Sequence, residues 1–298
     1  MNATGKGAVY ALGNFDGVHR GHQALLAQAR GLAHGAPLVA LTFEPHPRRF
    51  FAPTLPPFRL TLPAQKRDYL RAAGCDDVRV LDFNAQLAAM SAEDFARRIL
   101  AGECNAGAVV AGEDFRFGHG RAGDMARLAE WLRDSGIAVH PVPQVRDPQG
   151  QRYAASTVRA LLRNGQVRAA ADILGRPYII SGTVAHGDRR GNQLGFPTAN
   201  IDLDDYQRPQ YGVYAVQARA AGDSAWRPGI ANIGRRPTVD GVREWLEAHF
   251  FDFTADIYGT QWETALLDFI RPEMKFDGVE NLKRQIAEDI RVVRKIFA

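Results

Sequence analysis

Cysteine is scarce in this 298-residue chain, which contains only Cys75 and Cys104. Their separation matches neither a zinc-ligand spacing nor a redox pair, so we expect two reduced thiols in a cytosolic protein. The sequence also has no run of eighteen apolar residues and no charged-then-apolar leader at its start. These absences predict a cytoplasmic protein without a membrane partner.

A strong excess of charge is missing as well. The chain has 37 Lys and Arg residues against 33 Asp and Glu residues, which leaves a net charge of +4. This mildly basic balance suits anionic ligands such as nucleotides, but it falls short of a nucleic-acid-binding surface, and we expect no nucleic-acid partner. The length favours two domains.

A stretch rich in glycine and histidine lies between a predicted strand at 8–12 and a predicted helix at 23–30. Free backbone N–H groups at a helix start, together with the positive end of its dipole, attract anions. His19 and His22 are three residues apart and should share one face of the first helical turn. The stretch therefore predicts binding of a phosphate chain. The alternative is a glycine-rich turn with two solvated histidines.

Strands and helices alternate through the first half of the chain. Strands are predicted at 37–43, 78–83, 106–112 and 137–140, and helices at 62–73, 92–100 and 124–134. This alternation predicts a parallel sheet with helices on its faces, whose ligands bind beyond the carboxyl ends of the strands. We expect Lys66, Arg67 and Arg71 on the polar side of the second helix, and Ser91 as the N-cap of the third.

The second half has a different period. Closely spaced strands at 178–184, 211–218, 229–233, 245–253 and 262–270 predict an antiparallel barrel. Gly175 ends a short helix at 167–174, so we place the domains at 1–175 and 176–298. Apolar residues then recur at intervals of three and four up to Ile296, which predicts an amphipathic helix packed on the barrel, with Asp277 and Glu280 as a capping pair.

Two features of the second half carry chemistry. Gly187, Gly191 and Gly195 recur at every fourth position and let backbone N–H groups approach phosphates, but no Gly-Lys-Ser/Thr follows, which excludes a Walker P-loop. Thr198 and Asn200 are two apart on one strand face and offer oxygens to a hard cation. The alternative is a glycine-rich hairpin that ends in a strand.

Glu247 lies on a predicted strand face with aromatic residues. An apolar environment raises the proton affinity of a carboxylate, which suits a general base. The alternative is an ordinary exposed glutamate.

In this order, the motifs resemble those of the prokaryotic bifunctional riboflavin kinase/FMN adenylyltransferases. Residues 13–22 resemble the nucleotidylyltransferase signature GxFDGxHxGH, residues 42–47 the family's TFxPHP, and residues 112–118 its GxDFxFG loop. Residues 187–200 resemble GxxxGxxxGFPTAN, 231–238 resemble NIGxRPT, and 245–253 resemble (V/L)ExHxxDF. The resemblance implies a Rossmann-like nucleotidylyltransferase domain followed by a Greek-key β-barrel of the riboflavin kinase type.

The same resemblance implies two ATP-dependent reactions and assigns residues to them. The barrel would phosphorylate riboflavin to FMN, with Glu247 as base and Mg²⁺ held by Thr198 and Asn200; its nucleotide contacts would be Gly187, Gly191, Gly195, Phe196, Pro197 and Asn232. The first domain would transfer AMP from ATP to FMN, giving FAD and pyrophosphate, with His19 and His22 stabilising charge. Its ATP contacts would be Gly13, Asn14, Phe15, Asp16, Gly21, Arg152, Ser156 and Arg159, and its flavin contacts His46, Asp114, Phe115 and Arg116.

One segment departs from the family pattern. Arg152 and Arg159 keep the family's spacing, but Ala154 and Ala155 replace its two serines and Ser156 replaces its threonine. A hydroxyl bonded to a charged oxygen contributes about 1.5–3 kcal/mol, so we expect weakened adenylyl transfer. Ser156 alternatively serves as the N-cap of a helix at 157–163.

Three other functions stay open at this point. A riboflavin kinase with a weak or inactive adenylyltransferase half is the first. A class I tRNA-synthetase-like enzyme would explain the His-Arg-Gly-His string, but the chain has no Lys-Met-Ser-Lys-type loop. A non-enzymatic flavin- or nucleic-acid-binding protein would explain the basic charge but not Glu247 near a Thr-Asn pair. A homo-oligomer is compatible with the sequence.

Overall fold

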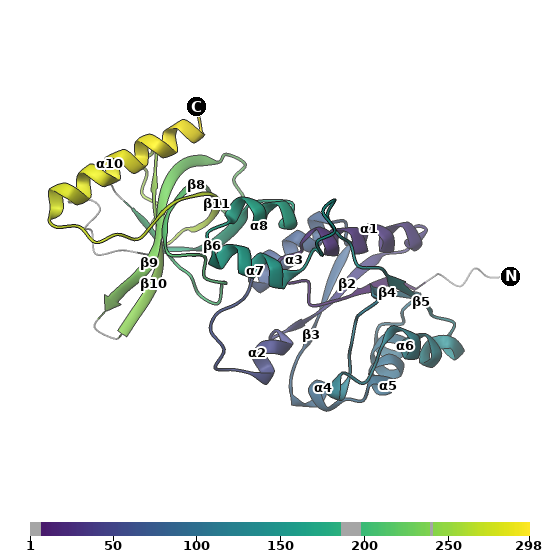
Figure 1. Cartoon of the computed structure of the whole chain (residues 1–298). Helices are drawn as coiled ribbons and strands as arrows, with labels where there is room; N and C mark the ends of the chain where they lie inside the picture. The colour runs from purple at the N-terminus through teal and green to yellow at the C-terminus, as the bar shows by residue number, and fades with distance from the viewer. Residues whose placement is uncertain (1–6, 186–197, 239–240) are drawn as a thin grey trace. The chain divides into compact units, whose positions relative to one another are not determined.

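The computed structural model describes residues 7–185, 198–238 and 241–298, and the chain forms two compact units (Figure 1). The first unit comprises Met1–Pro56 and Thr61–Ala154, and the second comprises Pro57–Leu60 and Ala155–Ala298. Four residues from the first half of the chain therefore belong with the second unit. The predicted domain boundary at 175/176 lies about one helix pair after Ala155, where the second unit resumes. The domain limits stay a prediction.

The first unit is built on a five-stranded parallel sheet with strand order β3-β2-β1-β4-β5. The strands are β1 (Val9–Leu12), β2 (Leu38–Glu44), β3 (Asp77–Asp82), β4 (Ala108–Gly112) and β5 (Ala138–Val142). After β1 the chain adds strands on one side and then returns to the other, so the switch in strand order falls between β1 and β4. This is the position at which parallel sheets open a crevice at their carboxyl ends.

Helices cover both faces of this sheet (Figure 1). One face packs against α1 (Arg20–Ala33) and α3 (Pro63–Ala72), where Leu26 and Leu70 are fully buried. The other face packs against α5 (Ala92–Asp94), the π-helix η1 (Phe95–Glu103) and α6 (Met125–Leu132). The remaining helical turns are α2 (Pro47–Phe51), α4 (Ala85–Ala89), η2 (His119–Arg121) and η3 (Arg133–Ser135). The predicted α/β architecture is confirmed.

Local details differ from the prediction in two places. The predicted helix at 92–100 begins as expected, with the Ser91 hydroxyl accepting the Asp94 N–H at 3.0 Å, but it continues as a π-helix to Glu103. Lys66, expected on a polar helix face, is only 3% exposed. That expectation was wrong, because this stretch of α3 faces the sheet.

The second unit is a closed six-stranded antiparallel barrel with strand order β10-β7-β6-β11-β8-β9, preceded by α7 (Ala155–Arg163) and α8 (Val167–Leu174). The strands are β6 (Tyr178–Ala185), β7 (Ala199–Asp202), β8 (Gly212–Ala220), β9 (Arg227–Thr238), β10 (Gly241–Phe250) and β11 (Gln261–Pro272). The barrel is confirmed, and Asn200 lies on a strand, β7, as predicted, whereas Thr198 directly precedes that strand. Gly175 caps α8 in the left-handed conformation, at φ 75°, as expected.

The C-terminal helix α10 (Val279–Ile296) packs on the barrel, as predicted. Val293 is fully buried against Val213 and Ile230 of β8 and β9. Its N-cap is Gly278, and no side-chain hydrogen bond caps it, so the predicted Asp277–Glu280 capping pair is wrong. Glycine occupies the cap because its φ of 93° disfavours a side chain.

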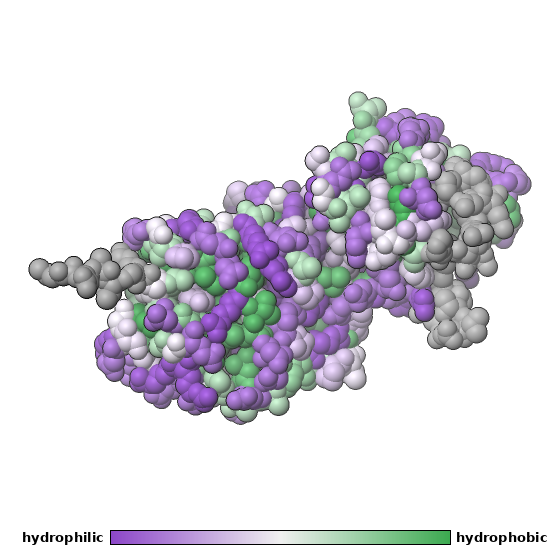
Figure 2. Space-filling view, turned by 180° about the vertical axis from the view of Figure 1, so that it is seen from behind, coloured by the Kyte–Doolittle hydropathy of each residue, from purple (hydrophilic) through white to green (hydrophobic). Residues whose placement is uncertain are grey.

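Hydrophilic residues cover most of the surface seen in Figure 2, and hydrophobic residues form a smaller group among them. Phe51, at 69%, is the most exposed of the large apolar residues that lie on the described surface. Within the described ranges, no helix has both the length and the apolar character needed to span a membrane.

Candidate nucleotide-binding sites

The first candidate site is the loop from Gly13 to His19, which joins the central strand β1 to α1. It lies at the carboxyl end of the sheet, next to the switch in strand order. The Gly13 N–H donates to the Leu41 carbonyl at 3.2 Å, which continues the β1–β2 pairing by one residue. The loop is therefore fixed to the sheet edge at its beginning and to the helix at its end.

The backbone of this loop is strained. Phe15 and Val18 have positive φ values of 50° and 40°, and Gly17 has 82°. A positive φ is a marked outlier for a β-branched residue such as Val18, and such strain is typical of functional loops held by their surroundings. Both Phe15 and Val18 are buried, so core packing holds the turn in place.

His19 and His22 stack on each other, with ring centroids 3.7 Å apart and an interplanar angle of 19°. His19 is the N-cap of α1 and is 6% exposed, and the Phe15 ring meets His22 edge-on at 5.2 Å. The two imidazoles thus share a face at a helix start, as their spacing predicted. A Cβ on Gly21 would come within 3.2 Å of the His19 ring, so a glycine there preserves this packing.

The Asp16 carboxylate is hydrogen-bonded within the protein. Its carboxylate accepts the Thr61 N–H at 3.2 Å and the Thr61 hydroxyl at 3.5 Å, and the same hydroxyl accepts the Gly17 N–H at 3.1 Å. Asp16 and Thr61 are 5% and 1% exposed. These bonds connect the loop to the segment before α3.

Lys66 of α3 contacts the same loop through its ammonium group. Its ammonium lies 2.7 Å from Glu44 Oε1, 3.1 Å from Thr42 Oγ1 and 3.4 Å from the Asn14 carbonyl oxygen. The Thr42 hydroxyl also donates to the Asn14 carbonyl at 3.2 Å. A buried ammonium is tolerated when its N–H groups meet oxygens, one of them charged.

The predicted flavin contacts lie on two other loops of the same unit. His46 is 9% exposed, and its Nδ1 accepts the Arg48 N–H at 3.1 Å, which leaves Nε2 as the ring's second polar atom. Asp114 and Arg152 form an ion pair at 2.6 Å, so a predicted flavin residue and a predicted ATP residue lie side by side. The Phe115 ring stacks with Phe117 at 5.7 Å.

Arg116 pairs with Asp124 at 2.7 Å. The pKa of Asp124 lies below its ordinary value, mainly because the Arg127 backbone N–H donates to this carboxylate at the start of α6, and also because of Arg116. The pair therefore fixes the Arg116 guanidinium at the start of α6.

The remaining predicted ATP contacts of the first reaction belong to the second unit. Ser156 is exposed in the first turn of α7, which begins at Ala155, so its alternative role as N-cap of a helix at 157–163 is wrong. Arg159 donates from Nε to the Phe58 carbonyl at 2.7 Å and lies over the Phe58 ring at 5.5 Å. Their part in the first site stays a prediction.

The second candidate site lies on three neighbouring barrel strands. In the register of the sheet, Glu247 of β10 stands directly opposite Asn200 of β7 on one side and opposite Asn232 of β9 on the other. Residues opposed in this way have Cβ atoms about 4.5–5.5 Å apart. Their neighbours Ile201, Leu246 and Ile233 are fully buried, so the three polar residues share the opposite face. The barrel therefore gathers a predicted base, metal ligand and nucleotide contact.

Thr198 immediately precedes β7, and its carbonyl accepts the Asn200 side-chain amide at 3.5 Å. A hydroxyl and an amide oxygen are donors that suit Mg²⁺. In the described part of the chain, no cluster of three or more His, Cys, Asp or Glu forms a metal site, so any cation here would rely on other oxygens. The predicted contacts Gly187, Gly191, Gly195, Phe196 and Pro197 lie outside the described residues.

An ion-pair cluster lies next to this row. Glu244 accepts from Arg208 at 2.7 Å, from the Tyr211 hydroxyl and from Arg235 at 3.3 Å. Burial alone would raise the pKa of Glu244, but the hydrogen bonds from Tyr211 and Arg208 outweigh it and lower the pKa. Its lowered pKa favours the charged form of Glu244, which suits its role as an ion-pair partner of Arg208 and Arg235.

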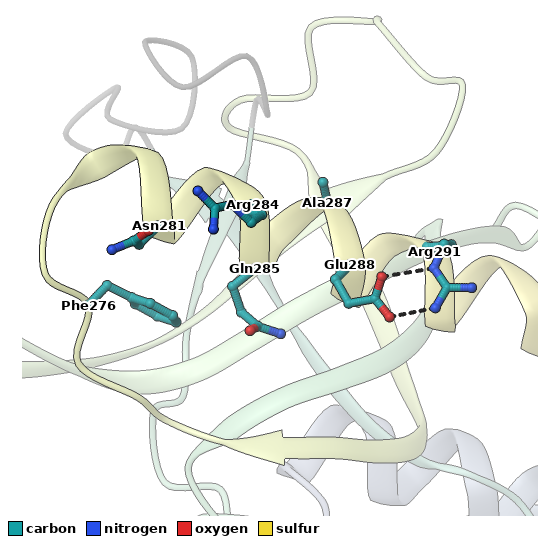
Figure 3. Close-up of a pocket in the computed structure, with 7 residues that line it drawn as sticks. All are labelled: Phe276, Asn281, Arg284, Gln285, Ala287, Glu288 and Arg291. Atoms are coloured by element: carbon teal, nitrogen blue, oxygen red, sulfur yellow. Dashed lines mark hydrogen bonds and ion pairs between the residues drawn. The ribbon is translucent and has the colours of Figure 1, made fainter.

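A cavity of about 660 Å³ opens along α10, beside Phe276 (Figure 3). Arg284 and Gln285 line it, and Glu288 pairs with Arg291 at 2.6 Å at one end. None of the predicted site residues lines this cavity.

Comparison with known proteins shows the family of this chain. A family model for FAD synthetase matches residues 1–157, and one for riboflavin kinase matches residues 174–297. A bifunctional riboflavin kinase/FMN adenylyltransferase from Escherichia coli strain K12 is 40% identical over 294 residues, covering 98% of this chain and 93% of that relative. The chain belongs to the bifunctional riboflavin kinase/FMN adenylyltransferase family.

Other relatives also match nearly the whole length of this chain. The bifunctional riboflavin kinase/FMN adenylyltransferase of Pseudomonas fluorescens is 40% identical, covering 98% of this chain and 94% of its own. A crystal structure described as a macrolide-efflux protein from Streptococcus pneumoniae is 34% identical, with a TM-score of 0.85, and covers 98% of this chain and 95% of its own. The order of the two matches, FAD synthetase first and riboflavin kinase second, is the order that the motifs predicted.

Two residues that support the first site in this riboflavin kinase/FMN adenylyltransferase were not predicted from the sequence. Thr61 and Lys66 both hold the loop of the first site, and neither belongs to a quoted motif. A signal for Lys66 did exist: Leu62 and Leu70 stand four residues to either side, so Lys66 falls on the apolar stripe of α3.

Proposed function

We propose that the two units divide FAD synthesis between them. The barrel phosphorylates riboflavin to FMN with ATP, and the α/β unit joins FMN to AMP from a second ATP, releasing pyrophosphate and giving FAD. The observation that carries the proposal is the row Asn200–Glu247–Asn232, which gathers three predicted kinase residues on adjacent strands of a chain whose two halves match the two enzymes of the family.

In the barrel, Glu247 would take the proton from the ribityl 5′-hydroxyl as this oxygen attacks the terminal phosphate of ATP. Asn232 would hold the nucleotide from one side. Thr198 and Asn200 would hold Mg²⁺, which supplies charge neutralisation for the phosphates when bound. The protein's contribution is mainly positioning, because the phosphoryl group passes in line from one oxygen to the other.

In the α/β unit, the loop from Gly13 to His19 would bind the triphosphate with backbone N–H groups at the start of α1. His19 and His22 would stabilise the charge that develops as the FMN phosphate attacks and pyrophosphate leaves. The flavin nucleotide would be contacted from the neighbouring loops by His46, Asp114, Phe115 and Arg116. Arg152, which pairs with Asp114, would contact ATP.

A second candidate is a riboflavin kinase with a weak adenylyltransferase half. It is favoured by one observation: Ala154 and Ala155 stand where the family resemblance expects two serines, and α7 already begins at Ala155. Two hydroxyl donors are thereby lost, which removes hydrogen bonds to charged oxygens worth about 1.5–3 kcal/mol each.

A single assay tests both candidates. The chain is incubated with riboflavin, ATP and Mg²⁺, and riboflavin, FMN and FAD are separated by chromatography over time. The proposed function predicts that FMN rises first and FAD follows. FMN that accumulates without FAD would favour the second candidate, and unchanged riboflavin would refute both. Omission of Mg²⁺ should stop phosphorylation.

Variants assign the reactions to the two units. Glu247→Gln should lower FMN formation by about 10²–10⁴-fold, the contribution of a general base, and leave the conversion of added FMN to FAD intact. His19→Ala combined with His22→Ala should do the reverse. Glu280→Gln and His34→Ala are matched controls, because both residues are exposed and outside the proposed sites. Loss of both activities in either active-site variant would contradict separate sites.

A further inference from the structure

Lys66 connects the two loops that the adenylyl-transfer site would use. The Asn14 carbonyl belongs to the loop after β1, whereas Thr42 and Glu44 form the end of β2, directly before Pro45 and His46. The ammonium lies within 3.4 Å of an oxygen from each of these three residues. Thr42 and Glu44 point to the same side of β2 because they are two residues apart.

Burial makes this arrangement electrostatically demanding. The side chains of Lys66 and Glu44 are 4% and 18% exposed, so water screens their charges poorly. As a pair they are neutral. Without the ammonium, the Glu44 carboxylate would place a negative charge at the same sheet edge as the proposed triphosphate site, and like charges repel more strongly where water is excluded.

We propose that Lys66 is a positioning residue for adenylyl transfer: it holds the Asn14 carbonyl away from the phosphates and cancels the charge of Glu44 at the edge where ATP binds. By fixing that carbonyl inward, it keeps the partial negative charge of this oxygen away from the anion. This inference rests on the proposed function of the α/β unit. Lys66 itself is placed beneath the loop and contacts the protein, so it acts through the loop and not as a catalytic group.

The test compares steady-state kinetics of FAD formation from FMN and ATP in four proteins: wild type, Lys66→Met, Lys66→Met with Glu44→Gln, and the control Arg67→Met. Arg67 is the exposed neighbour on the same helix, and its loss removes the same charge without touching the loop. Riboflavin phosphorylation is measured on each preparation, because the barrel is untouched by these changes and reports on the amount of intact enzyme.

We expect Lys66→Met to raise the KM for ATP by about tenfold or more, the scale of one poorly screened charge–charge interaction. The double variant should recover most of the lost affinity for ATP, because it removes the buried carboxylate that faced the ammonium. Its kcat should stay below wild type, because the Asn14 carbonyl has lost the ammonium and keeps the Thr42 hydroxyl as a donor. Arg67→Met should match wild type, and riboflavin phosphorylation should be equal in all four.

Three outcomes would overturn the inference. A KM for ATP within twofold of wild type in Lys66→Met would show that the ammonium does not act on nucleotide binding. A double variant with a KM as high as the single variant would show a merely structural role, since restoring neutrality would not help. A wild-type chain that makes no FAD would refute the proposed function together with this role, whereas the first two outcomes refute only the role of Lys66.

Discussion

Replacing Thr61 by valine would test whether the strained loop is held by the hydroxyl that the structure places behind it. Valine keeps the shape of threonine and replaces only the hydroxyl by a methyl group. That oxygen is buried, accepts the Gly17 N–H at 3.1 Å and donates to Asp16 at 3.5 Å. The second bond is at the limit of hydrogen-bonding distance and contributes little.

The expected magnitude follows from the first bond. Removing the acceptor of a buried N–H costs about 1–3 kcal/mol, because the donor loses its partner without gaining water. The Thr61 backbone N–H still reaches Asp16 at 3.2 Å, so the loop should open more often without unfolding the unit. Opening should become about 5- to 150-fold more frequent.

Hydrogen exchange followed by mass spectrometry measures this directly, because amide exchange in a peptide covering residues 13–19 reports on local opening. The matched control is Thr264→Val. Thr264 is fully buried in the barrel, and within the described chain its hydroxyl has no hydrogen-bond partner. Removing an unsatisfied hydroxyl should leave the barrel equally or more stable.

The two substitutions are chemically identical and should have opposite consequences. If Thr61→Val leaves exchange at residues 13–19 unchanged, the hydroxyl does not hold the loop. The other contrary result is that Thr264→Val accelerates exchange in β11 as much as Thr61→Val does in the loop. Exchanging any buried hydroxyl for a methyl group would then explain the faster exchange, and the hydrogen-bond explanation would be wrong.

Three further predictions concern stability. Gly212→Ala should destabilise the barrel by about 2 kcal/mol or more, measured by urea unfolding, because its φ of 149° disfavours a side chain and a Cβ would overlap the Arg271 carbonyl oxygen; a change below 0.5 kcal/mol would contradict this. Asp289→Ala should cost about 3–5 kcal/mol and speed hydrogen exchange in α10, because Asp289 is 3% exposed and pairs with Arg271 at 2.7 Å; unchanged exchange would refute the anchoring role. Burial raises the pKa of the Cys75 thiol to about 11, so at pH 8 only about 0.1% should be thiolate and a thiol reagent should label it only after unfolding. Rapid labelling of the folded chain at pH 8 would contradict this. Because the folded pKa exceeds the ordinary value of 9.0, the contribution of the protonated Cys75 thiol to the free energy of unfolding is complete below pH 9 and is lost as the pH rises through about 11.

The architecture followed from the sequence because its signals are local. Apolar strands alternate with helices before Gly175 and with turns after it, and this change of period separates the parallel sheet from the barrel. The strand β7 was predicted only through Thr198 and Asn200, without bounds, because its four residues, Ala199–Asp202, directly follow the glycine-rich stretch and have no alternation of their own. Short strands of this kind are defined by their partners, here β6 and β10.

The candidate sites followed only in part. Motifs named Asn200, Asn232 and Glu247 one by one, but their position in one row depends on the pairing of β10 with β7 and β9, which no local pattern encodes. Thr61 reaches Gly17 across 44 residues of sequence, and nothing near it distinguishes it from a surface threonine. Lys66 was misplaced because lysine is rarely buried, and its apolar neighbours at intervals of four were the stronger guide.

The four residues Pro57–Leu60 have a practical meaning for anyone who wants the barrel alone. Arg59 exchanges backbone hydrogen bonds with Asp205 and Gln207, pairs its side chain with Asp205 at 3.0 Å, and is 7% exposed. A fragment that begins at Ala155 would leave these partners facing water and uncover an apolar surface that Phe58 and Leu60 now fill. Truncation of the chain before Ala155 would therefore destabilise the isolated barrel. A peptide of residues 57–60, added to the fragment or fused to it, should restore these contacts.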